Sequence, residues 1–332
     1  MLRLNESRVR SWADEQGFAD LSLAELDYRL VQVLRILYGN SFLAKRLYLK
    51  GGTAINKLYL KATPRLSVDL DFNHIGSKDQ VLGERGQVRE EITRFLKAQD
   101  PSYDIQVKRK YEQTTLNIRY RTLMGTPQHF KMEISHIERF PILEPVEKQL
   151  ETSEGPFGIA TYQLEELTAT KLRALFERFK GRDIYDLYFV SKLEPEPTTT
   201  RKLFLYYFYR SRKVFNPKVY FRNLGERYSS GSYIDDVSRF VKPTVQFSLK
   251  EAAGHAMSYC SFLGELDERD KDFLALARLL LDREIAKKKL DKVKQIKHPI
   301  EHLFGDLKIS KEAKEISTDQ IRLYSKKKQH EP

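Results

Sequence analysis

An alternation of apolar and polar residues runs through residues 67–73, where Val68, Leu70 and Phe72 alternate with polar neighbours. A period of two is typical of a strand that buries one face. Three further strands are predicted downstream, and the same alternation supports the last two; their ranges are 103–110, 114–121 and 129–135. The pattern therefore predicts a β-sheet in the first half of the chain.

Helical spacing of apolar residues precedes this sheet. Residues 1–46 are predicted to be helical, with Ser22 and Glu25 forming a capping box at the start of the main helix. Gly39 and Asn40 end that helix in the prediction.

Less regular segments follow the first strand. Residues 76–86 are polar and are predicted to form a loop, and residues 90–98 are predicted to be the end of an amphipathic helix. Prolines and glycines across 137–160 predict irregular structure and a domain boundary.

The second half of the chain has a helical pattern. Residues 162–190 carry an apolar stripe at helical spacing, interrupted at Gly181. The aromatic run at 203–209 is predicted to pack in a core, although aromatic rings can also stack on bases. The predicted fold class is α/β (α+β), with a mixed β-sheet domain and flanking helices over 1–145 and a mainly helical domain over 146–332.

Composition and charge narrow the class of protein. The chain has 332 residues, 41% hydrophobic and 31% charged, with a formal net charge of +12. This composition is typical of a globular protein, and the charge favours a polyanionic partner, nucleic acid above all. The single cysteine, Cys260, excludes an intramolecular disulfide framework and a cysteine-based zinc cluster. Neither a signal peptide nor a membrane span is predicted, so we expect a cytoplasmic protein with no membrane partner.

Two acidic residues and a glycine pair are the candidates for chemistry. Asp69 and Asp71 project from the same side of the predicted strand, and two carboxylates that close repel unless a cation lies between them. Mg²⁺ prefers oxygen ligands and can bridge to phosphates. Gly51 and Gly52 can bring backbone amides close to a ligand, and Thr53 is a suitable N-cap for a helix whose N-terminus would face a phosphate. The alternative is a plain turn followed by a strand with two solvent-facing aspartates.

The segment GGTAI, followed downstream by RLSVDLDF, resembles the first motif of the nucleotidyltransferase superfamily related to DNA polymerase beta. More narrowly, it resembles the AbiEii-type toxins, which include the mycobacterial MenT toxins. The resemblance implies that Asp69 and Asp71 hold Mg²⁺, or Mn²⁺ in its place, and that the glycine-rich turn binds an NTP. The nucleotide-binding residues implied here are Gly51, Gly52, Thr53, Arg65 and Ser67.

A third carboxylate is expected on the predicted strand 129–135. The superfamily places one on a later strand of the sheet, and Glu133 matches that position best. Glu133 would be a metal ligand, or would take a proton from the attacking hydroxyl. The alternative is an exposed strand residue paired with Lys131 or Arg119. We interpret the neighbouring His136 as a surface histidine rather than a base.

A second stretch, EELTATKLRALFER with RDIYDL shortly after it, resembles a motif in the helical half of AbiEii-type proteins. The resemblance implies that Lys171 and Asp186 are catalytic and that Arg182 and Asp183 contact the nucleotide. Lys171 would bind the triphosphate and neutralise charge on the leaving pyrophosphate. The alternative is a structural network of ion pairs between two helices; its members would be Arg173, Arg178, Arg182, Asp183 and Asp186.

The function expected from these features is Mg²⁺-dependent transfer of a nucleoside monophosphate from an NTP to an acceptor hydroxyl, with a tRNA 3′ end as acceptor. The resemblance implies the toxin of a toxin–antitoxin or phage-defence pair, with an antitoxin of the transcription-regulator type as partner. Two alternatives stay open: the same chemistry on a protein or small molecule, and a non-catalytic nucleic-acid-binding protein on the same fold. Basic runs at 286–297 and 325–328 could contact RNA phosphates.

Overall fold

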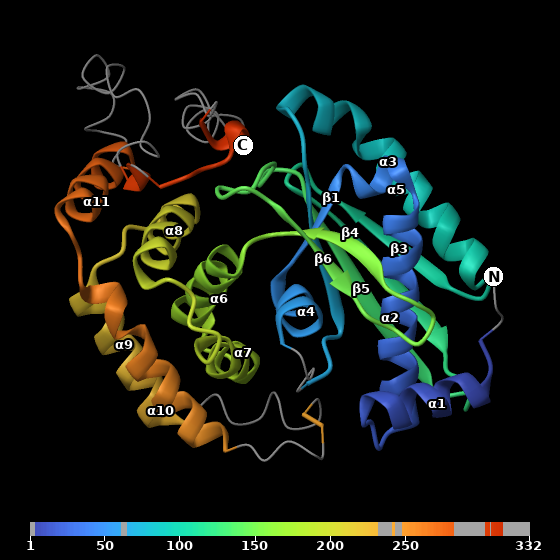
Figure 1. The fold of residues 1–332 in the computed structure, drawn as a ribbon. Helices are drawn as coiled ribbons and strands as arrows, with labels where there is room; N and C mark the ends of the chain where they lie inside the picture. The colour runs from blue at the N-terminus through green and yellow to red at the C-terminus, as the bar shows by residue number, and fades with distance from the viewer. Residues whose placement is uncertain are drawn as a thin grey trace, which may run out of the picture. The chain divides into compact units, whose positions relative to one another are not determined.

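Figure 1 shows the computed structural model of the chain, which describes residues 4–60, 65–231, 241–242, 248–281, 303–305 and 307–314. Contacts within the chain group it into two units. The sheet unit takes residues up to Phe140 and Pro145–Tyr162, and the helical unit takes most of the chain from Gln163 on. No helix in these described ranges is long and apolar enough to cross a membrane. The basic runs at 286–297 and 325–328 lie outside the described residues.

The sheet has the strand order β3-β4-β5-β2-β1-β7-β6. It is mixed, because β2 is parallel to β5 and β1 is parallel to β7, whereas the other neighbours are antiparallel. The strands are β1 Leu47–Lys50, β2 Asp69–His74, β3 Asp104–Arg109, β4 Gln113–Arg121, β5 Pro127–Ser135, β6 Val146–Leu150 and β7 Phe157–Thr161. The predicted strands at 103–110, 114–121 and 129–135 are confirmed, and the predicted mixed sheet followed by helices is confirmed as the fold class.

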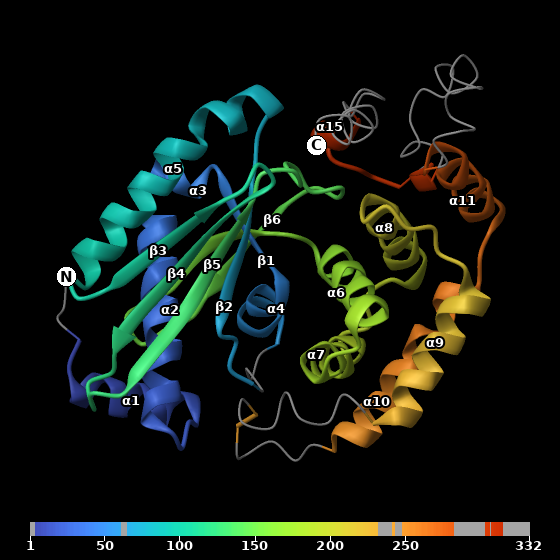
Figure 2. The ribbon, with the colours of Figure 1, turned by 180° about the vertical axis from the view of Figure 1, so that it is seen from behind.

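The two faces of the sheet differ in polarity because side chains alternate along each strand. Leu70 and Phe72 of β2 and Met132 of β5 are fully buried on one face. Helices α2 Leu21–Gly39 and α5 Lys78–Gln99 lie on the same side of the sheet, as Figures 1 and 2 show. The remaining helices of this unit are α1 Glu6–Gln16, α3 Ser41–Ala44, α4 Gly51–Ala54 and the π-helical η1 Ile55–Tyr59.

The capping box predicted for the N-terminal helix was wrong. Asp20 caps α2, because its Oδ1 accepts hydrogen bonds from the amides of Ser22 and Leu23 at 2.7 and 3.3 Å. Glu25 is instead buried in an ion pair with Arg29 at 2.8 Å. The predicted stop of this helix at Gly39 is confirmed.

The loop predicted at 76–86 was also wrong, because α5 begins at Lys78 and runs through it. Ser77 caps this helix by accepting from the Gln80 amide. Gly83 and Gly86 lie in the helix interior, where each costs about 1 kcal/mol relative to alanine. Burial of the apolar stripe outweighs that cost; its members are Val81, Val88, Ile92 and Leu96.

Residues 137–160, predicted to be irregular, contain two strands. β6 and β7 form an antiparallel pair, and Leu49 of β1 is the parallel partner of Thr161 in β7. Pro141 and Pro145 precede β6, and Gly155 and Pro156 lie between the two strands, whereas Gly158 lies within β7. The sheet therefore extends past residue 145, as far as Thr161.

The helical unit is built around aromatic rings. Phe176, Phe204, Phe208 and Phe215 pack with ring centroids 4.9–5.7 Å apart. The prediction that the run 203–209 packs in a core is confirmed, since residues 203–208 are buried. The helices here are α6 Leu164–Arg178, α7 Gly181–Ser191, α8 Pro197–Arg210, α9 Pro217–Ser230, α10 Leu249–Tyr259, η3 Cys260–Gly264, α11 Glu268–Leu281 and α15 Lys311–Lys314.

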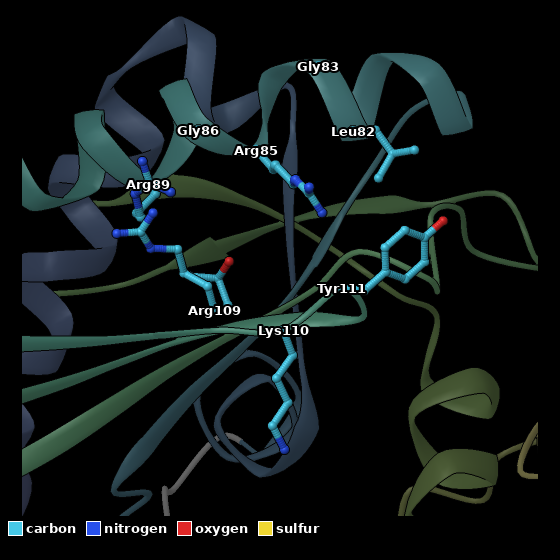
Figure 3. A pocket seen from close by; sticks show the side chains of 9 residues that line it. Leu82, Gly83, Arg85, Gly86, Arg89, Arg109, Lys110 and Tyr111 are labelled. Atoms are coloured by element: carbon cyan, nitrogen blue, oxygen red, sulfur yellow. The ribbon is translucent and has the colours of Figure 1, made fainter. Parts of the chain in front are cut away.

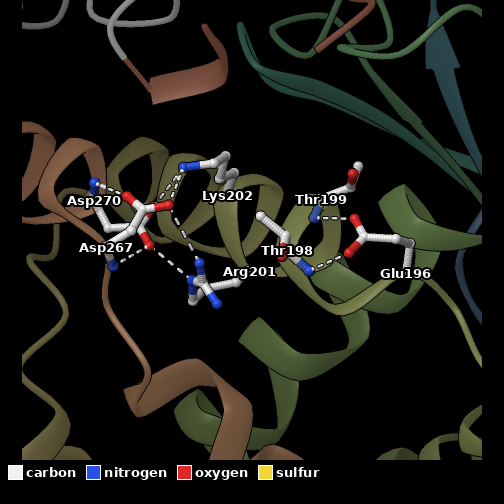
Figure 4. Close-up of polar contacts among 7 residues, drawn as sticks. All are labelled: Glu196, Thr198, Thr199, Arg201, Lys202, Asp267 and Asp270. Atoms are coloured by element: carbon white, nitrogen blue, oxygen red, sulfur yellow. Dashed lines mark hydrogen bonds and ion pairs between the residues drawn. The ribbon is translucent and has the colours of Figure 1, made fainter. Parts of the chain in front are cut away.

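Ion pairs join α8 to the start of α11 (Figure 4). Arg201 contacts Asp270 at 2.7 Å, and Lys202 contacts both Asp270 and Asp267, at 3.1 and 2.9 Å. Asp270 is fully buried, so these cations offset the cost of burying its charge. Glu196 caps the N-terminus of α8 by accepting hydrogen bonds from the backbone amides of Thr198 and Thr199.

Two histidines are buried beneath α5. His136, which we predicted to lie on the surface, is only 4% exposed, and His74 is fully buried. Their rings meet edge to face at 5.5 Å, and Thr114 Oγ1 lies 2.8 Å from His136 Nε2. The pKa of each ring is lowered to about 4, mainly by burial, and the nearby Arg85 charge contributes to the lowering at His136. Both imidazoles are therefore neutral at pH 7.

Acidification should destabilise the sheet unit through this pair. Unfolded imidazoles take up protons near pH 6.5, whereas the folded rings stay neutral down to about pH 4. Between these pH values the unfolded state binds more protons than the folded state. The free energy of unfolding therefore decreases as the pH is lowered, by up to about 1.4 kcal/mol per pH unit for each ring. Urea titrations followed by fluorescence of Trp12, the single tryptophan, would measure this slope. His136→Gln should reduce the slope by about one proton, and an unchanged slope would refute the assignment.

Candidate active site

The aspartates lie on β2, and the strand register gathers other charged side chains on the same face. Asp71 is paired with Glu133 of β5 and with Lys50 of β1, and Asp69 is paired with Lys131 of β5. Paired residues of neighbouring strands point to the same side, with backbones about 4.8 Å apart. All five residues are partly exposed. The sheet thus brings Glu133 next to Asp71, where the sequence analysis expected a third carboxylate.

Gly51 allows the Asp71 carboxylate to lie directly against the turn that follows β1. Gly51 has φ of 73°, a left-handed conformation that favours glycine. A Cβ atom at this position would lie 2.5 Å from Asp71 Oδ2 and 3.3 Å from its Cγ. Any larger residue would be strained and would displace the carboxylate. The glycine-rich turn and the Asp71 carboxylate are therefore in direct contact and belong to one candidate site.

Thr53 is not the helix N-cap that the sequence predicted. Helix α4 already begins at Gly51, with Lys50 in the capping position and no side-chain cap. Thr53 lies inside the helix and is buried, and its Oγ1 donates a hydrogen bond to the Asp69 carbonyl oxygen at 2.5 Å. This hydrogen bond joins α4 to the start of β2. It offsets part of the destabilisation that the two glycines cause in the first turn of α4.

Arg65 and Ser67 lead into β2. Arg65 is 4% exposed, and its guanidinium donates to the Leu66 carbonyl at 2.8 Å. Ser67 is buried, and its Oγ has no hydrogen-bond partner among the residues that the structure describes. A buried hydroxyl without a partner is costly, so Ser67 fits a position that a ligand completes.

The carboxylates around Asp71 are candidate ligands for a divalent cation. Across the described ranges, no three His, Cys, Asp or Glu side chains are arranged to hold a metal ion by themselves. Mg²⁺, however, usually binds one or two carboxylates together with water and substrate phosphates rather than an all-protein cage. Asp69 and Asp71, beside a glycine-rich turn, are hard oxygen donors of that kind. The residues therefore fit a cation that is shared with a phosphate group.

A second charged cluster lies in the helical unit. Lys171 of α6 contacts Asp186 and Asp183 of α7 at 2.9 and 3.3 Å, and Arg178 contacts Asp183 at 2.7 Å. Both aspartates are fully buried and Lys171 is 8% exposed. Burial acts to raise the pKa of the Asp183 carboxyl, but the Lys171 and Arg178 charges outweigh it and hold that pKa below its usual value. Four of the predicted charged residues are thus brought together as ion pairs.

The turn between α6 and α7 positions this cluster. Phe179 ends α6 with φ of 47°, which is uncommon for a residue with a side chain, and is itself buried. Gly181, predicted as a break, is the first residue of α7. Arg182 follows it and is partly exposed. Such strain persists where the surrounding packing enforces it, and here it turns the aspartates of α7 toward Lys171.

Comparison with known proteins decides the family. A family model described as nucleotidyl transferase AbiEii toxin, type IV TA system, matches residues 35–283, most of the chain. The chain belongs to the AbiEii family of nucleotidyltransferase toxins. The resemblance drawn from the two motifs is thereby confirmed. Membership supports a nucleotidyltransferase enzyme and implies an NTP substrate, a divalent cation and an antitoxin partner.

Solved structures agree with this AbiEii assignment at the level of the fold. The nucleotidyltransferase toxin MenT4 of Mycobacterium tuberculosis H37Rv is similar with a TM-score of 0.61 and 19% identity, over 87% of this chain and 97% of that chain. An antigenic nucleotidyltransferase-like protein from Paracoccidioides brasiliensis gives a TM-score of 0.35 and 14% identity, over 65% of this chain and 96% of that chain, too low to carry an argument. No curated protein matches the chain.

Two lysines next to the aspartates were not predicted as candidate site residues from the sequence. Lys131 is the strand partner of Asp69, and Lys50 is the strand partner of Asp71 and donates to Glu138 at 2.8 Å. Alternation along β5 put Lys131 on the same face as Glu133. Only the pairing of β2 with β5, which joins residues far apart in the sequence, places it next to Asp69.

Proposed function

We propose that this AbiEii-family protein transfers a nucleoside monophosphate from an NTP to a hydroxyl of RNA, with the 3′ end of tRNA as acceptor. The acceptor oxygen attacks the α-phosphorus, the bond to the β-phosphate breaks, and pyrophosphate leaves. The observation that carries the proposal is the contact between Gly51 and the Asp71 carboxylate. It joins a turn suited to phosphates to a strand suited to a cation.

Each candidate site residue of the sheet unit has a proposed role in this reaction. Asp69 and Asp71 would hold a divalent ion, with Mg²⁺ as our assignment; when bound, it neutralises charge on the phosphates. The turn at Gly51 and Gly52 would place backbone amides against the triphosphate, with Thr53, Arg65 and Ser67 completing the nucleotide site. Glu133 would accept the proton that the attacking hydroxyl loses.

The helical unit is proposed to supply the cation that acts on the leaving group. Lys171 would neutralise charge that builds on pyrophosphate. Asp186 and Asp183 hold its ammonium group at 2.9 and 3.3 Å, which fixes its position. Arg182 is proposed to contact the nucleotide.

The biological role that we propose is that of a toxin in a toxin–antitoxin or phage-defence pair. Its partner would be an antitoxin of the transcription-regulator type. The net charge of +12 supports RNA rather than a protein or a small molecule as acceptor. Because NTPs and tRNA are its proposed substrates, we propose that it acts in the cytoplasm.

A labelling experiment tests the reaction and the acceptor together. The protein is incubated with Mg²⁺, unfractionated tRNA and each of the four NTPs labelled at the α-phosphate. We expect label in tRNA that RNase removes and that sequencing locates at 3′ ends. Label that survives RNase would indicate a protein or small-molecule acceptor. Salt-sensitive binding of RNA with no transfer from any NTP would indicate a non-catalytic binding protein.

A further inference from the structure

A pocket of about 510 Å³ lies on the sheet unit, away from the aspartates (Figure 3). One wall is α5, through Arg85, Arg89 and the two glycines of its interior. The other wall is the end of β3, through Arg109, and the turn that follows it, through Tyr111. Nothing in the proposed reaction uses this pocket.

The cations of the pocket lack neighbouring negative charge. Among the residues that the structure describes, Arg85, Arg109 and Lys110 have no carboxylate at ion-pair distance, and Arg89 pairs only with the exposed Glu90. Figure 3 shows the guanidinium groups of Arg89 and Arg109 turned toward each other. Like charges that line one pocket repel one another, so the arrangement favours an anion in the pocket.

The shape of the pocket suits an extended ligand. Gly83 and Gly86 leave the face of α5 without side chains, and a Cβ at either position would meet nothing within 4 Å. These glycines therefore keep one wall open rather than avoiding a clash. Tyr111 at the rim is 41% exposed. An exposed aromatic ring among cations is the combination that binds single-stranded nucleic acid, through base stacking and phosphate contacts.

Cations lie on both faces of the edge strand β3. Arg109 lines the pocket on the α5 side, whereas the Lys110 side chain points to the other side of the turn (Figure 3). By register, Lys108 shares its face and its row with Glu133 and Asp71. Three inter-strand spacings, about 14 Å, separate Lys108 from Asp71. A nucleic-acid strand held in the pocket can thus pass round the edge to the face that carries the aspartates.

We propose that this pocket binds backbone phosphates of the acceptor RNA, a few nucleotides from the end that reacts. The inference rests on the proposed transfer to RNA. It assigns the pocket to the RNA backbone rather than to the triphosphate of the NTP, which has its own seat at Gly51.

Binding measured without NTP tests the pocket independently of catalysis. The full-length protein is titrated into end-labelled tRNA at several salt concentrations, and ATP binding with Mg²⁺ is measured in parallel. The double variant Arg85→Gln with Arg109→Gln should weaken tRNA binding about tenfold or more and lower the slope of log K against log salt by roughly 1.5. ATP binding should not change. Arg85→Lys with Arg109→Lys should retain most of the affinity, which separates lost charge from misfolding.

The matched control removes two charges elsewhere on the same unit. Arg10 and Arg94 are exposed and pair with glutamates of their own helices at 2.6 Å, so Arg10→Gln with Arg94→Gln should change tRNA affinity less than twofold. Three results would overturn the proposal. They are an equal loss of tRNA affinity in the Arg85/Arg109 and Arg10/Arg94 double variants, a loss of ATP binding in the Arg85/Arg109 variant, and competition by polyglutamate against labelled tRNA that is as strong as competition by unlabelled tRNA. If the wild type binds tRNA through Arg85 and Arg109 but transfers no nucleotide, the pocket stands and the proposed reaction fails. If the double variant transfers with an unchanged KM for tRNA, the reaction stands and the pocket fails.

Discussion

Replacing Asp71 by asparagine should lower the rate of nucleotide transfer about 10³-fold, because the amide keeps the shape of the side chain but not its charge. Asp69→Asn should have a similar effect, since both carboxylates face the proposed cation from neighbouring pleats. The stability of these two variants should increase rather than decrease. Removing one of two adjacent negative charges relieves their repulsion, so the free energy of unfolding should rise by about 1 kcal/mol. Initial rates with labelled NTP, and urea unfolding followed by Trp12 fluorescence, measure the two quantities.

Asp104→Asn is the matched control for this pair. Asp104 is also a strand aspartate, but it lies at the sheet edge, exposed and 4.0 Å from Arg119. Its replacement should leave the transfer rate within about twofold. Unchanged transfer by Asp71→Asn would refute the catalytic assignment of the strand. Loss of transfer together with a large loss of stability would mean that Asp71 is a structural residue.

Replacing Lys171 by methionine should have the largest effect on stability, lowering the free energy of unfolding of the helical unit by about 3–5 kcal/mol. Methionine fills a similar volume but leaves the fully buried Asp186 without its lysine partner and Asp183 with Arg178 as the neighbouring cation. Urea unfolding should be followed by far-UV circular dichroism, whose signal includes the helices of this unit. Tryptophan fluorescence would not report on it, because the single tryptophan, Trp12, lies in the sheet unit.

The double variant Lys171→Met with Asp186→Asn separates structure from catalysis. It removes one charge of each sign, so much of the lost stability should return. Transfer should stay at least about 10²-fold below the wild type if Lys171 acts on the leaving group. Recovery of activity together with stability would show that the cluster is only the structural network that the sequence also allowed. The two aspartates of β2 should show the opposite relation between activity and stability.

Local patterns predicted most of the sheet but not its register. The alternation in β4 and β5 is long enough to specify strands, and the alternation at 67–73 put Asp69 and Asp71 on one face of β2. The neighbours Lys50, Glu133 and Lys131 are set by pairing between distant segments, which no local pattern contains. Glu133 was found only through a resemblance, and Lys131 was found by neither route.

The errors have a common cause in tertiary packing. Gly83 and Gly86 made α5 look like a loop, but burial of its apolar stripe decides the outcome. Thr53 has the chemistry of an N-cap, yet α4 starts three residues earlier than that cap would place it, because Gly51 tolerates a left-handed backbone against Asp71. His136 followed a strand and was predicted to be exposed, but it lies beneath α5 with His74. In each case the residue type allowed two environments, and contacts from elsewhere in the chain chose between them.

Two contacts join α4 to β2, so the proposed phosphate-binding turn and the carboxylate pair are held rigidly together. Gly51 abuts the Asp71 side chain, and Thr53 grips the backbone of Asp69. A ligand that settles on either half restricts both, so nucleotide and cation should each tighten the affinity for the other by the same factor. This coupling between nucleotide binding and cation binding would not require the movement of a separate hinge or lid.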